Sequence, residues 1–505
     1  MTPDKTHIIF GPPGTGKTTR LLNIADEYLK GSYKPNEICF VSFTRKAAYE
    51  ARDRAIEKFN LDKSDLPYFR TLHSLAWEAL GMLPAQMINN SDKTNIAKEL
   101  GLFFSLRDFY TLPEEINIIG STKGDRLMMT EQLARSKMID LKTEWNNTEY
   151  EDIPWEEMEQ FWEYYSRYKF EKGKMDFIDM ISNFNKVAPE LDHKILIVDE
   201  VQDLTQVQWG MIDVLSETAE YTYIAGDDDQ AIYRWSGADV YTLQNIPGKR
   251  EILTQSYRCP EKVWDLASKI ISKVKHRVAK DWKPRLEEGT VEYIDEIWRL
   301  DMTKGTWLIL VRNNKYITDY EEYCLTNGLF FRSVRKTPDA HKALQAIFFW
   351  EELRDGKPLT AGAIKKVYSF MRKNLQYGAK SILNKYPETS LLTLTNLSED
   401  IGLKTQEIWY KALDKLTPLQ IAYYWQCRNN GEKLKQEPRI LISTIHQVKG
   451  GEADNVVLDP EIGLKTWEAA QTNPEEEARV WYVGVTRAKK SVYILQPISK
   501  YYYEL

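Results

Sequence analysis

The stretch that decides the fold is Ile195-Leu196-Ile197-Val198-Asp199-Glu200-Val201-Gln202-Asp203. Its apolar part is too short for a helix and rich in β-branched residues, which predicts a strand buried on both faces. Carboxylates that end such a strand lie where open α/β sheets bind their ligands. We therefore expect Asp199 and Glu200 to face a binding site at the edge of a parallel sheet.

A second apolar run at residues 221–225 ends in Gly226-Asp227-Asp228-Asp229-Gln230, and Ala231-Ile232-Tyr233-Arg234-Trp235-Ser236-Gly237 follows. The acidic and amide groups suit a metal–phosphate centre. The aromatic cluster suits stacking on a base. Together these segments predict a site that joins nucleotide hydrolysis to a grip on a nucleic-acid strand.

A phosphate-binding loop is indicated by Gly11-Pro12-Pro13-Gly14-Thr15-Gly16-Lys17-Thr18. It follows a predicted strand at residues 7–10 and precedes a predicted helix at residues 19–30. Glycines let backbone N–H groups turn toward the β-phosphate, Lys17 supplies charge to the β- and γ-phosphates, and Thr18 offers its hydroxyl to Mg²⁺. The loop predicts a nucleoside triphosphate as ligand, although many ATPase classes share it.

Length and composition limit the possibilities. A chain of 505 residues and 59.0 kDa is expected to form about three or four domains. The formal net charge of −6 neither suggests nor excludes a nucleic-acid partner, because the local charge along a groove decides. No apolar run is long enough to span a bilayer, so no membrane partner is expected. The 4 cysteines are scattered, which argues against zinc, iron–sulfur and disulfide sites and fits a reducing cytoplasm.

The run from residue 261 to residue 285 carries eight Lys or Arg residues against three acids. The simplest interpretation is the solvated face of a helix.

The remaining chain alternates between sheet and helical patterns. Further strands are predicted at residues 38–43, 251–253, 290–294, 306–311, 439–443, 455–458 and 491–495. The regions 81–174 and 335–438 are helical in periodicity, and the second is rich in lysine. The pattern predicts two α/β cores, each interrupted by a mostly helical domain.

The ordered set of motifs resembles the UvrD/Rep family of superfamily 1 DNA helicases. The motifs are residues 11–18, Phe43-Thr44-Arg45-Lys46-Ala47-Ala48, Thr71-Leu72-His73-Ser74, residues 199–203, residues 226–230, Tyr257-Arg258, residues 444–452 and Val485-Thr486-Arg487-Ala488. AAA+ ATPases and the other branch of superfamily 1 share the first motif. Residues 226–237 and the ending at Ala488 favour the UvrD/Rep branch.

The resemblance implies an α/β fold with two RecA-like P-loop NTPase cores, parallel sheets with flanking helices, and a nucleotide between them. The first core would comprise residues 1–80 and 175–258, with a helical insertion at 81–174. The second would comprise residues 259–334 and 439–505, with a helical insertion at 335–438.

The resemblance also implies ATP as nucleotide and Mg²⁺ as its metal. Glu200 would orient and deprotonate the attacking water, and Gln230 would sense the γ-phosphate. Lys17 would hold the phosphates, and Arg258 and Arg487 would stabilise transition-state charge from across the cleft. An arginine in such a position is worth about 10³–10⁵ in rate.

A larger set of residues is expected to bind the nucleotide. By the resemblance it comprises Gly14, Thr15, Gly16, Lys17, Thr18, Thr19, Arg20, Tyr257 and Glu452, with Thr18 and Asp199 as the Mg²⁺ ligands. Tyr257 would stack on adenine and Glu452 would hold the ribose. Family members often carry an arginine directly after the loop's Lys-Thr. Here Thr19 stands at that position and Arg20 follows.

Single-stranded DNA is the implied polymer. Residues at positions that contact it in the family are Phe43, Thr44, His73, Trp235 and His446. Arg234 is added because the family commonly reads Gly-Trp-Arg-Gly where this chain reads Arg234-Trp235-Ser236-Gly237. A core-packing role for Trp235 and a capping or core role for His73 are the structural alternatives.

We therefore expect an ATP-dependent DNA helicase that moves 3′ to 5′ on single-stranded DNA and opens junctions with duplex DNA. An alternative is a single-stranded-DNA-stimulated ATPase that displaces bound proteins with little unwinding, and a third is a nucleotide-gated binding module without turnover. The expected location is the cytoplasm of a bacterial or phage-infected cell. The insertions are candidate contacts for replication or repair proteins.

Overall fold

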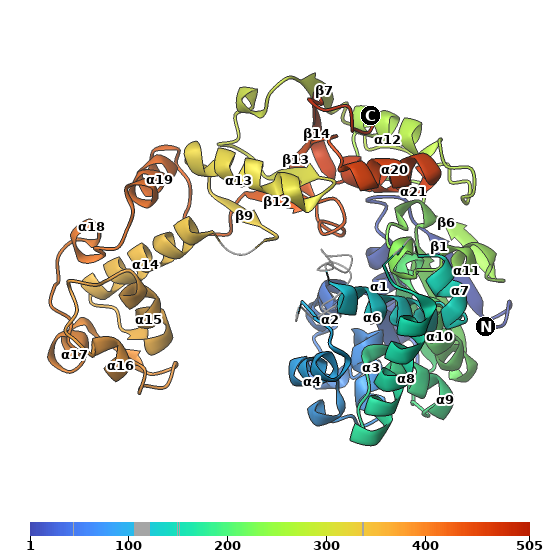
Figure 1. Cartoon of the computed structure of the whole chain (residues 1–505). Helices are drawn as coiled ribbons and strands as arrows, with labels where there is room; N and C mark the ends of the chain where they lie inside the picture. Colours follow the sequence, from blue (N-terminus) through green and yellow to red (C-terminus); the bar gives the residue numbers. More distant parts are fainter. Residues whose placement is uncertain (44, 106–121, 149, 151, 336–337) are drawn as a thin grey trace.

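The computed structural model describes residues 1–43, 45–105, 122–148, 150, 152–335 and 338–505. Two parallel sheets, each with six strands among these residues, form the centres of two stacked cores (Figure 1). The prediction of an α/β fold with two parallel-sheet cores is confirmed.

The first sheet has the strand order β3-β2-β4-β5-β1-β6. Its strands are β1 (Thr6–Phe10), β2 (Ile38–Ser42), β3 (Phe69–Thr71), β4 (Ile195–Asp199), β5 (Tyr221–Gly226) and β6 (Lys249–Ile252). Because β5 lies between β4 and β1, the segment after β5 emerges between the ends of these two strands. This order brings the three sequence motifs that follow β1, β4 and β5 to one edge of the sheet.

Helices connect the parallel strands of the first core, as parallel pairing requires. They are α1 (Lys17–Lys30), α2 (Arg45–Phe59), α3 (Leu72–Ala79), α9 (Phe177–Val187), α10 (Gln206–Thr218) and α11 (Val240–Asn245). Every residue of β4 is buried, which agrees with a strand covered on both faces.

The second sheet has the strand order β7-β14-β13-β8-β12-β9. Its strands are β7 (Thr290–Ile294), β8 (Trp307–Val311), β9 (Phe331–Ser333), β12 (Ile440–Thr444), β13 (Ala453–Leu458) and β14 (Ala488–Leu495). The helices of this core are α12 (Glu261–Ile271), α13 (Ile317–Thr326), α20 (Leu464–Thr472) and α21 (Pro474–Val485). Buried side chains of both cores, such as Tyr233 and Trp481, belong to one continuous apolar cluster.

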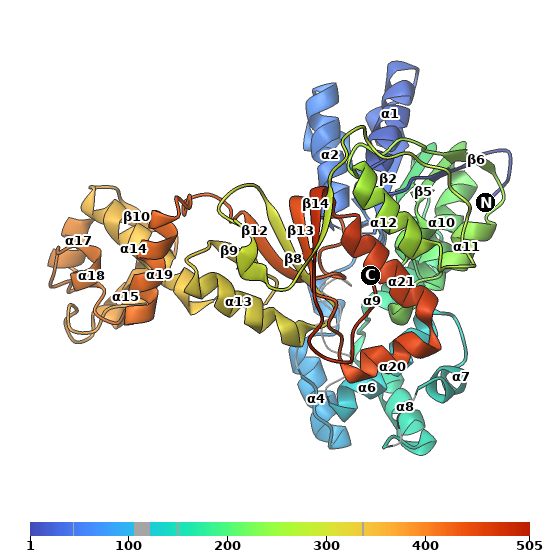
Figure 2. The same ribbon diagram turned by 90° about the horizontal axis from the view of Figure 1, so that it is seen from above.

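Two helical regions interrupt the cores. The first contains α4 (Asn90–Leu100), α6 (Lys123–Ser136), α7 (Leu141–Asn146) and α8 (Trp155–Lys172), which lie beside the first core (Figure 1). The second contains α14 (Asp339–Arg354), β10 (Leu359–Thr360), α15 (Ala361–Ser369), α16 (Ala379–Leu383), β11 (Leu391–Leu392), α17 (Leu394–Glu399), α18 (Trp409–Ala412) and α19 (Pro418–Asn429). This second region has its own apolar core and projects from the body as an arm in both views (Figures 1 and 2).

The structure changes one expectation from the sequence. The basic run is not a single solvated helix face, because α12 ends at Ile271 and the segment beyond it has no helix. The side chain of Lys280 in that segment is fully buried.

No helix among the described residues is both long and apolar enough to cross a bilayer.

Candidate active site

The predicted phosphate-binding loop, residues 11–18, connects β1 to α1. Gly14 and Gly16 have φ angles of 72° and 82°, in the left-handed region that glycine enters without strain. Lys17 Nζ folds back and donates to the Gly11 carbonyl over 2.9 Å. The Thr18 hydroxyl donates to Asp199 Oδ2 over 2.7 Å, which joins the loop to the end of β4. The loop therefore presents a cation and backbone N–H groups beside a carboxylate.

Two acidic residues end β4. Burial and the neighbouring charge of Glu200 raise the pKa of Asp199 to about 6. Burial opposes ionisation of Glu200 as well, but Lys17 and Lys449 outweigh it and lower the pKa of Glu200. Glu200 also has a φ of 56°, which costs energy for a residue with a Cβ and is a feature of functional positions. The Thr18 hydroxyl and the Asp199 carboxylate are oxygen donors of the type that Mg²⁺ prefers.

The acidic turn after β5 differs from our expectation of a metal–phosphate centre. The carboxylates of Asp227, Asp228 and Asp229 are buried within 4.8 Å of one another. Lys280 Nζ lies among them, 3.0 Å from Asp227 and 2.9 Å from Asp229. A lysine therefore takes the position that a metal ion would have there. The next residue, Gln230, carries the amide that faces the second core.

Arg487, at the end of α21 in the second core, reaches this amide. Its Nη2 donates to Gln230 Oε1 over 2.9 Å, and its Nε donates to the Val483 carbonyl over 2.9 Å. Burial and the nearby Arg258 lower the pKa of Arg487 to about 10, so the group remains charged at neutral pH. The charge of Arg487 also contributes to lowering the pKa of Glu200.

Arg258 lies against the predicted phosphate-binding loop. A Cβ placed on Gly14 would be 2.3 Å from Arg258 Cβ, so only glycine fits at position 14. The Ser256 hydroxyl donates to the Pro13 carbonyl over 2.8 Å and holds the segment in place. Arg258 Nε donates to Glu452 Oε2 over 2.7 Å. Both predicted arginines are thus brought to the side of the first core that carries Lys17 and Glu200.

The remaining predicted nucleotide residues lie around this centre. Tyr257 is 73% exposed. Glu452 is held by ion pairs to Arg258 and Lys489. Arg20 Nε forms an ion pair of 3.1 Å with Glu251 on β6, and Thr19 is exposed on α1. Thr15 is buried and its hydroxyl donates to the Pro12 carbonyl.

The predicted strand-binding residues divide into groups. The ring of Phe43 lies 6.3 Å from that of Tyr233, the ring of Tyr233 lies 6.2 Å from that of His446, and the ring of His446 lies 6.4 Å from that of Trp235. These four rings form one aromatic group where the cores meet. His73 contacts Phe177 edge to face at 5.5 Å.

Arg234 has contacts of a different kind. Its guanidinium lies 5.2 Å from the centre of the Tyr241 ring and 3.4 Å from a Glu476 carboxylate oxygen. Thr44 lies outside the described residues.

Sequence reasoning missed Lys449 in the second core. Its Nζ donates to Asp203 Oδ1 and to the Gln230 carbonyl, each over 2.7 Å. Burial raises the pKa of Asp203 to about 6, although Lys449 opposes the shift. Lys449 lies within the motif at residues 444–452, but its residue type alone predicts neither of these partners.

Comparisons with known proteins agree with this geometry. The model of the UvrD/REP helicase N-terminal domain matches residues 1–250, and that of the UvrD-like helicase C-terminal domain matches residues 366–497. The chain belongs to the UvrD/Rep family of helicases.

Curated UvrD/Rep relatives match over nearly the whole chain. The ATP-dependent DNA helicase Rep of Buchnera aphidicola subsp. Baizongia pistaciae is 23% identical, with 98% of this chain and 90% of that protein covered. A probable DNA helicase II homolog of Mycoplasma genitalium is 24% identical, with coverages of 97% and 82%. The Rep helicase of Buchnera aphidicola subsp. Schizaphis graminum is 28% identical, with coverages of 96% and 90%.

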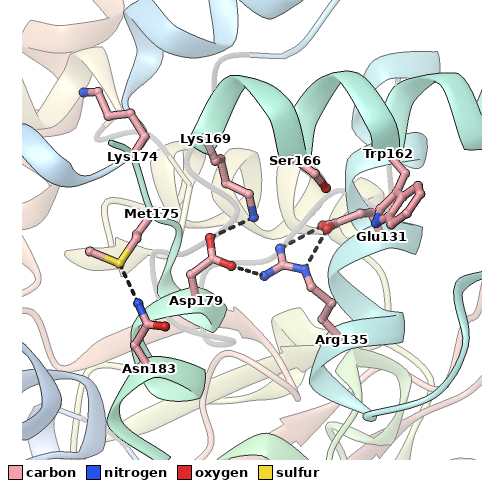
Figure 3. A pocket seen from close by; sticks show the side chains of 9 residues that line it. All are labelled: Glu131, Arg135, Trp162, Ser166, Lys169, Lys174, Met175, Asp179 and Asn183. Atoms are coloured by element: carbon pink, nitrogen blue, oxygen red, sulfur yellow. Dashed lines mark hydrogen bonds and ion pairs between the residues drawn. The ribbon is translucent and has the colours of Figure 1, made fainter. Parts of the chain in front are cut away.

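This UvrD/Rep family member also has a hollow between α6, α8 and α9 (Figure 3). Four of the charged residues on its walls pair with one another: Arg135 with Glu131 and Asp179, and Lys169 with Asp179. Such pairing stabilises the packing of the three helices. We therefore assign the hollow a structural role, separate from the candidate active site.

Proposed function

We propose that this protein is an ATP-dependent DNA helicase that moves 3′ to 5′ on single-stranded DNA and separates strands at junctions with duplex DNA. The polarity is that of the UvrD/Rep branch. The observation that carries the proposal is the bond from Arg487 to Gln230, because it joins the second core to the edge of the first sheet that carries the predicted phosphate-binding loop. Tyr233, three residues beyond Gln230, contacts His446 of the aromatic group.

Hydrolysis would use charges that the fold already brings together. The transition state of phosphoryl transfer is loose, so it needs positioning and positive charge more than covalent help from the protein. Lys17, Arg258 and Arg487 supply that charge. Glu200, kept ionised by Lys17, would orient the attacking water and take its proton. Thr18 and Asp199 would hold Mg²⁺, which when bound neutralises charge on the phosphate oxygens.

Movement would follow from the division of the site between the two cores. Arg487 and Glu452 come from motifs of the second core, whereas Lys17 and Glu200 belong to the first. Full transition-state stabilisation therefore needs the two cores close together. Each round of ATP binding and product release would change their separation.

The strand would lie along the aromatic group. Phe43, His73, Trp235 and His446 would contact bases, with Thr44 and Arg234 as further contacts. Stacking on aromatic rings is worth about 1–3 kcal/mol per base and is tolerant of sequence, which suits a protein that regrips every nucleotide. We retain residues 1–80 with 175–258, and 259–334 with 439–505, as the two cores, and residues 81–174 and 335–438 as their insertions.

One experiment tests the proposal. Forked duplexes with a 3′ or a 5′ single-stranded tail are incubated with ATP and Mg²⁺, and strand release is followed together with phosphate production. Release from the 3′-tailed fork supports a 3′-to-5′ helicase. DNA-stimulated hydrolysis without release supports an ATPase that displaces bound proteins. The absence of hydrolysis rules out both.

A further inference from the structure

The acidic turn after β5 is a cage built around one lysine. Asp227, Asp228 and Asp229 have no exposed surface, and three carboxylates so close together repel one another strongly. Lys280 Nζ forms ion pairs with all three. Burial alone would lower the pKa of Lys280, but the three carboxylates outweigh it and raise the pKa, so the ammonium stays charged.

Further cations complete the cage. Arg277 Nε donates to Asp229 Oδ1 over 2.7 Å, and its Nη2 donates to the other oxygen of the same carboxylate. Asp228 also accepts from the backbone N–H of Val278 over 2.7 Å. Arg479 Nε donates to the Asp228 carbonyl over 3.1 Å. The turn is thus neutralised from outside the first sheet.

The cage sets the direction of the Gln230 amide. Lys280 pairs with one oxygen of Asp227, and the other oxygen accepts from Gln230 Nε2 over 2.7 Å. The Gln230 backbone N–H also donates to the Asp227 carbonyl over 2.9 Å. With Nε2 fixed in this way, Gln230 Oε1 is left to face Arg487.

The cations come from the side of the second core. Arg277 and Lys280 lie between α12 and β7, and Arg479 lies on α21. Arg479 Nη2 also donates to the His276 carbonyl over 2.9 Å, which ties this segment to α21. The turn that carries Gln230 belongs to the first sheet and is also bonded by Gln202 and Gln244 of the first core, but its cations come from the second core.

We infer that Lys280 is a positioning residue for Gln230: by neutralising the three-carboxylate cage it fixes the amide that faces Arg487 and the γ-phosphate. The inference rests on the proposed ATPase function and adds to it a residue outside the motifs. Loss of the ammonium would leave Asp227 free to turn or take a proton, and the Gln230 amide would lose its fixed direction. ATP is still expected to bind through the loop at residues 11–18, because Lys280 forms its ion pairs with the three carboxylates and the charge of Lys17 acts on Asp227 only through space.

The test compares Lys280→Met with Lys262→Met, whose lysine is exposed and pairs with Glu288 on the surface. Lys280→Met is expected to lower DNA-stimulated kcat by about 10-fold or more, and to change the dissociation constant of a fluorescent ATP analogue by less than about 3-fold. Lys262→Met is expected to match the unmodified protein. In a Gln230→Ala background Lys280→Met is expected to lower kcat by less than about 2-fold further, because the residue to be positioned is gone.

A second variant covers the case in which Lys280→Met does not fold. Lys280→Met combined with Asp228→Asn keeps the charge balance of the cage, and it is still expected to lower kcat because Asp227 has lost its cation. The inference is overturned if kcat of either folded variant stays within about 2-fold of the unmodified protein, or if Lys280→Met has the same effect with and without Gln230. Absence of hydrolysis by the unmodified protein would instead overturn the proposed function, and this inference with it.

Discussion

The hydroxyl of Tyr233, in the first core, donates a hydrogen bond of 2.8 Å to the backbone carbonyl of His446, in the second. Tyr233 follows the γ-phosphate sensor candidate Gln230 by three residues, and its ring lies 6.3 Å from that of Phe43. A single short segment therefore contacts the candidate hydrolysis centre, the other core and the aromatic group. We therefore propose Tyr233 as a link between ATP hydrolysis and the binding of single-stranded DNA.

Tyr233→Phe keeps the ring and removes the hydroxyl that donates to the His446 carbonyl. A lost hydrogen bond of this kind is worth about 0.5–1.5 kcal/mol, so the single-stranded DNA concentration that half-saturates the ATPase is expected to rise about 2- to 10-fold. Hydrolysis without DNA is expected to stay within about 2-fold. Steady-state phosphate release across a DNA titration measures both.

The control for this change is Tyr33→Phe, which removes a hydroxyl that bonds Glu220 on the surface. It is expected to behave like the unmodified protein. Equal losses with and without DNA in Tyr233→Phe would contradict a role in coupling.

Glu200→Gln is expected to bind ATP and not turn it over. The change removes the proton acceptor but keeps the size of the side chain, and general-base catalysis contributes about 10²–10⁴ in rate. The single-turnover rate is therefore expected to fall by about 10²-fold or more, with the affinity for a fluorescent ATP analogue within about 3-fold. Glu288→Gln, on the surface, is the matched control. Normal hydrolysis by Glu200→Gln would show that another group activates the water.

Trp235→Ala is expected to weaken single-strand binding more than hydrolysis without DNA. Loss of one base-stacking platform costs about 1–3 kcal/mol, or roughly 5- to 150-fold in the dissociation constant for single-stranded DNA. Fluorescence anisotropy with a labelled oligonucleotide measures the loss. Trp162→Ala removes a partly exposed tryptophan from the hollow of Figure 3 and serves as control. Equal losses of both activities in Trp235→Ala would instead indicate a packing role.

The strands that carry the candidate site could be predicted because their apolar runs are long enough to be distinctive. Strand β4 (Ile195–Asp199) and strand β5 (Tyr221–Gly226) lie within a residue of their predicted limits. Strand β9 (Phe331–Ser333) could not be predicted, because three residues carry too little periodicity and its pairing partner β12 is distant in sequence.

The contacts between the cores were beyond prediction for a different reason. Lys280 lies in a segment whose composition suggests solvent exposure, and its burial depends on three carboxylates that the fold brings to it. Three adjacent aspartates indicate that some cation is needed, but the sequence cannot say whether a metal, a lysine or an arginine supplies it. The ion pair of Lys449 could not be predicted either, because its partner Asp203 lies on the other core.

The arm offers a prediction about pH. His341, on α14, is buried beside the rings of Phe331 and Tyr423, and burial lowers its pKa from 6.5 to about 4. As the pH falls below 6.5, the unfolded arm binds a proton at this histidine, whereas the folded arm does not. The free energy of unfolding of the arm is therefore unaffected by protonation of His341 above pH 6.5 and decreases between pH 6.5 and about pH 4. The full loss is on the order of 3 kcal/mol.

Hydrogen exchange in peptides from α14 and α19, corrected for the intrinsic pH dependence of exchange, would measure this loss between pH 7 and about pH 4.5. His341→Phe keeps an aromatic ring in the apolar site and removes the titrating group, so its arm is expected to lose less stability over the same range. His276→Gln, at a side chain that is 76% exposed, is expected to follow the unmodified protein. If His341→Phe and the unmodified protein lose protection equally as the pH falls, groups other than His341 control the acid sensitivity of the arm. The reason is that the variant lacks the buried imidazole and is otherwise identical in sequence.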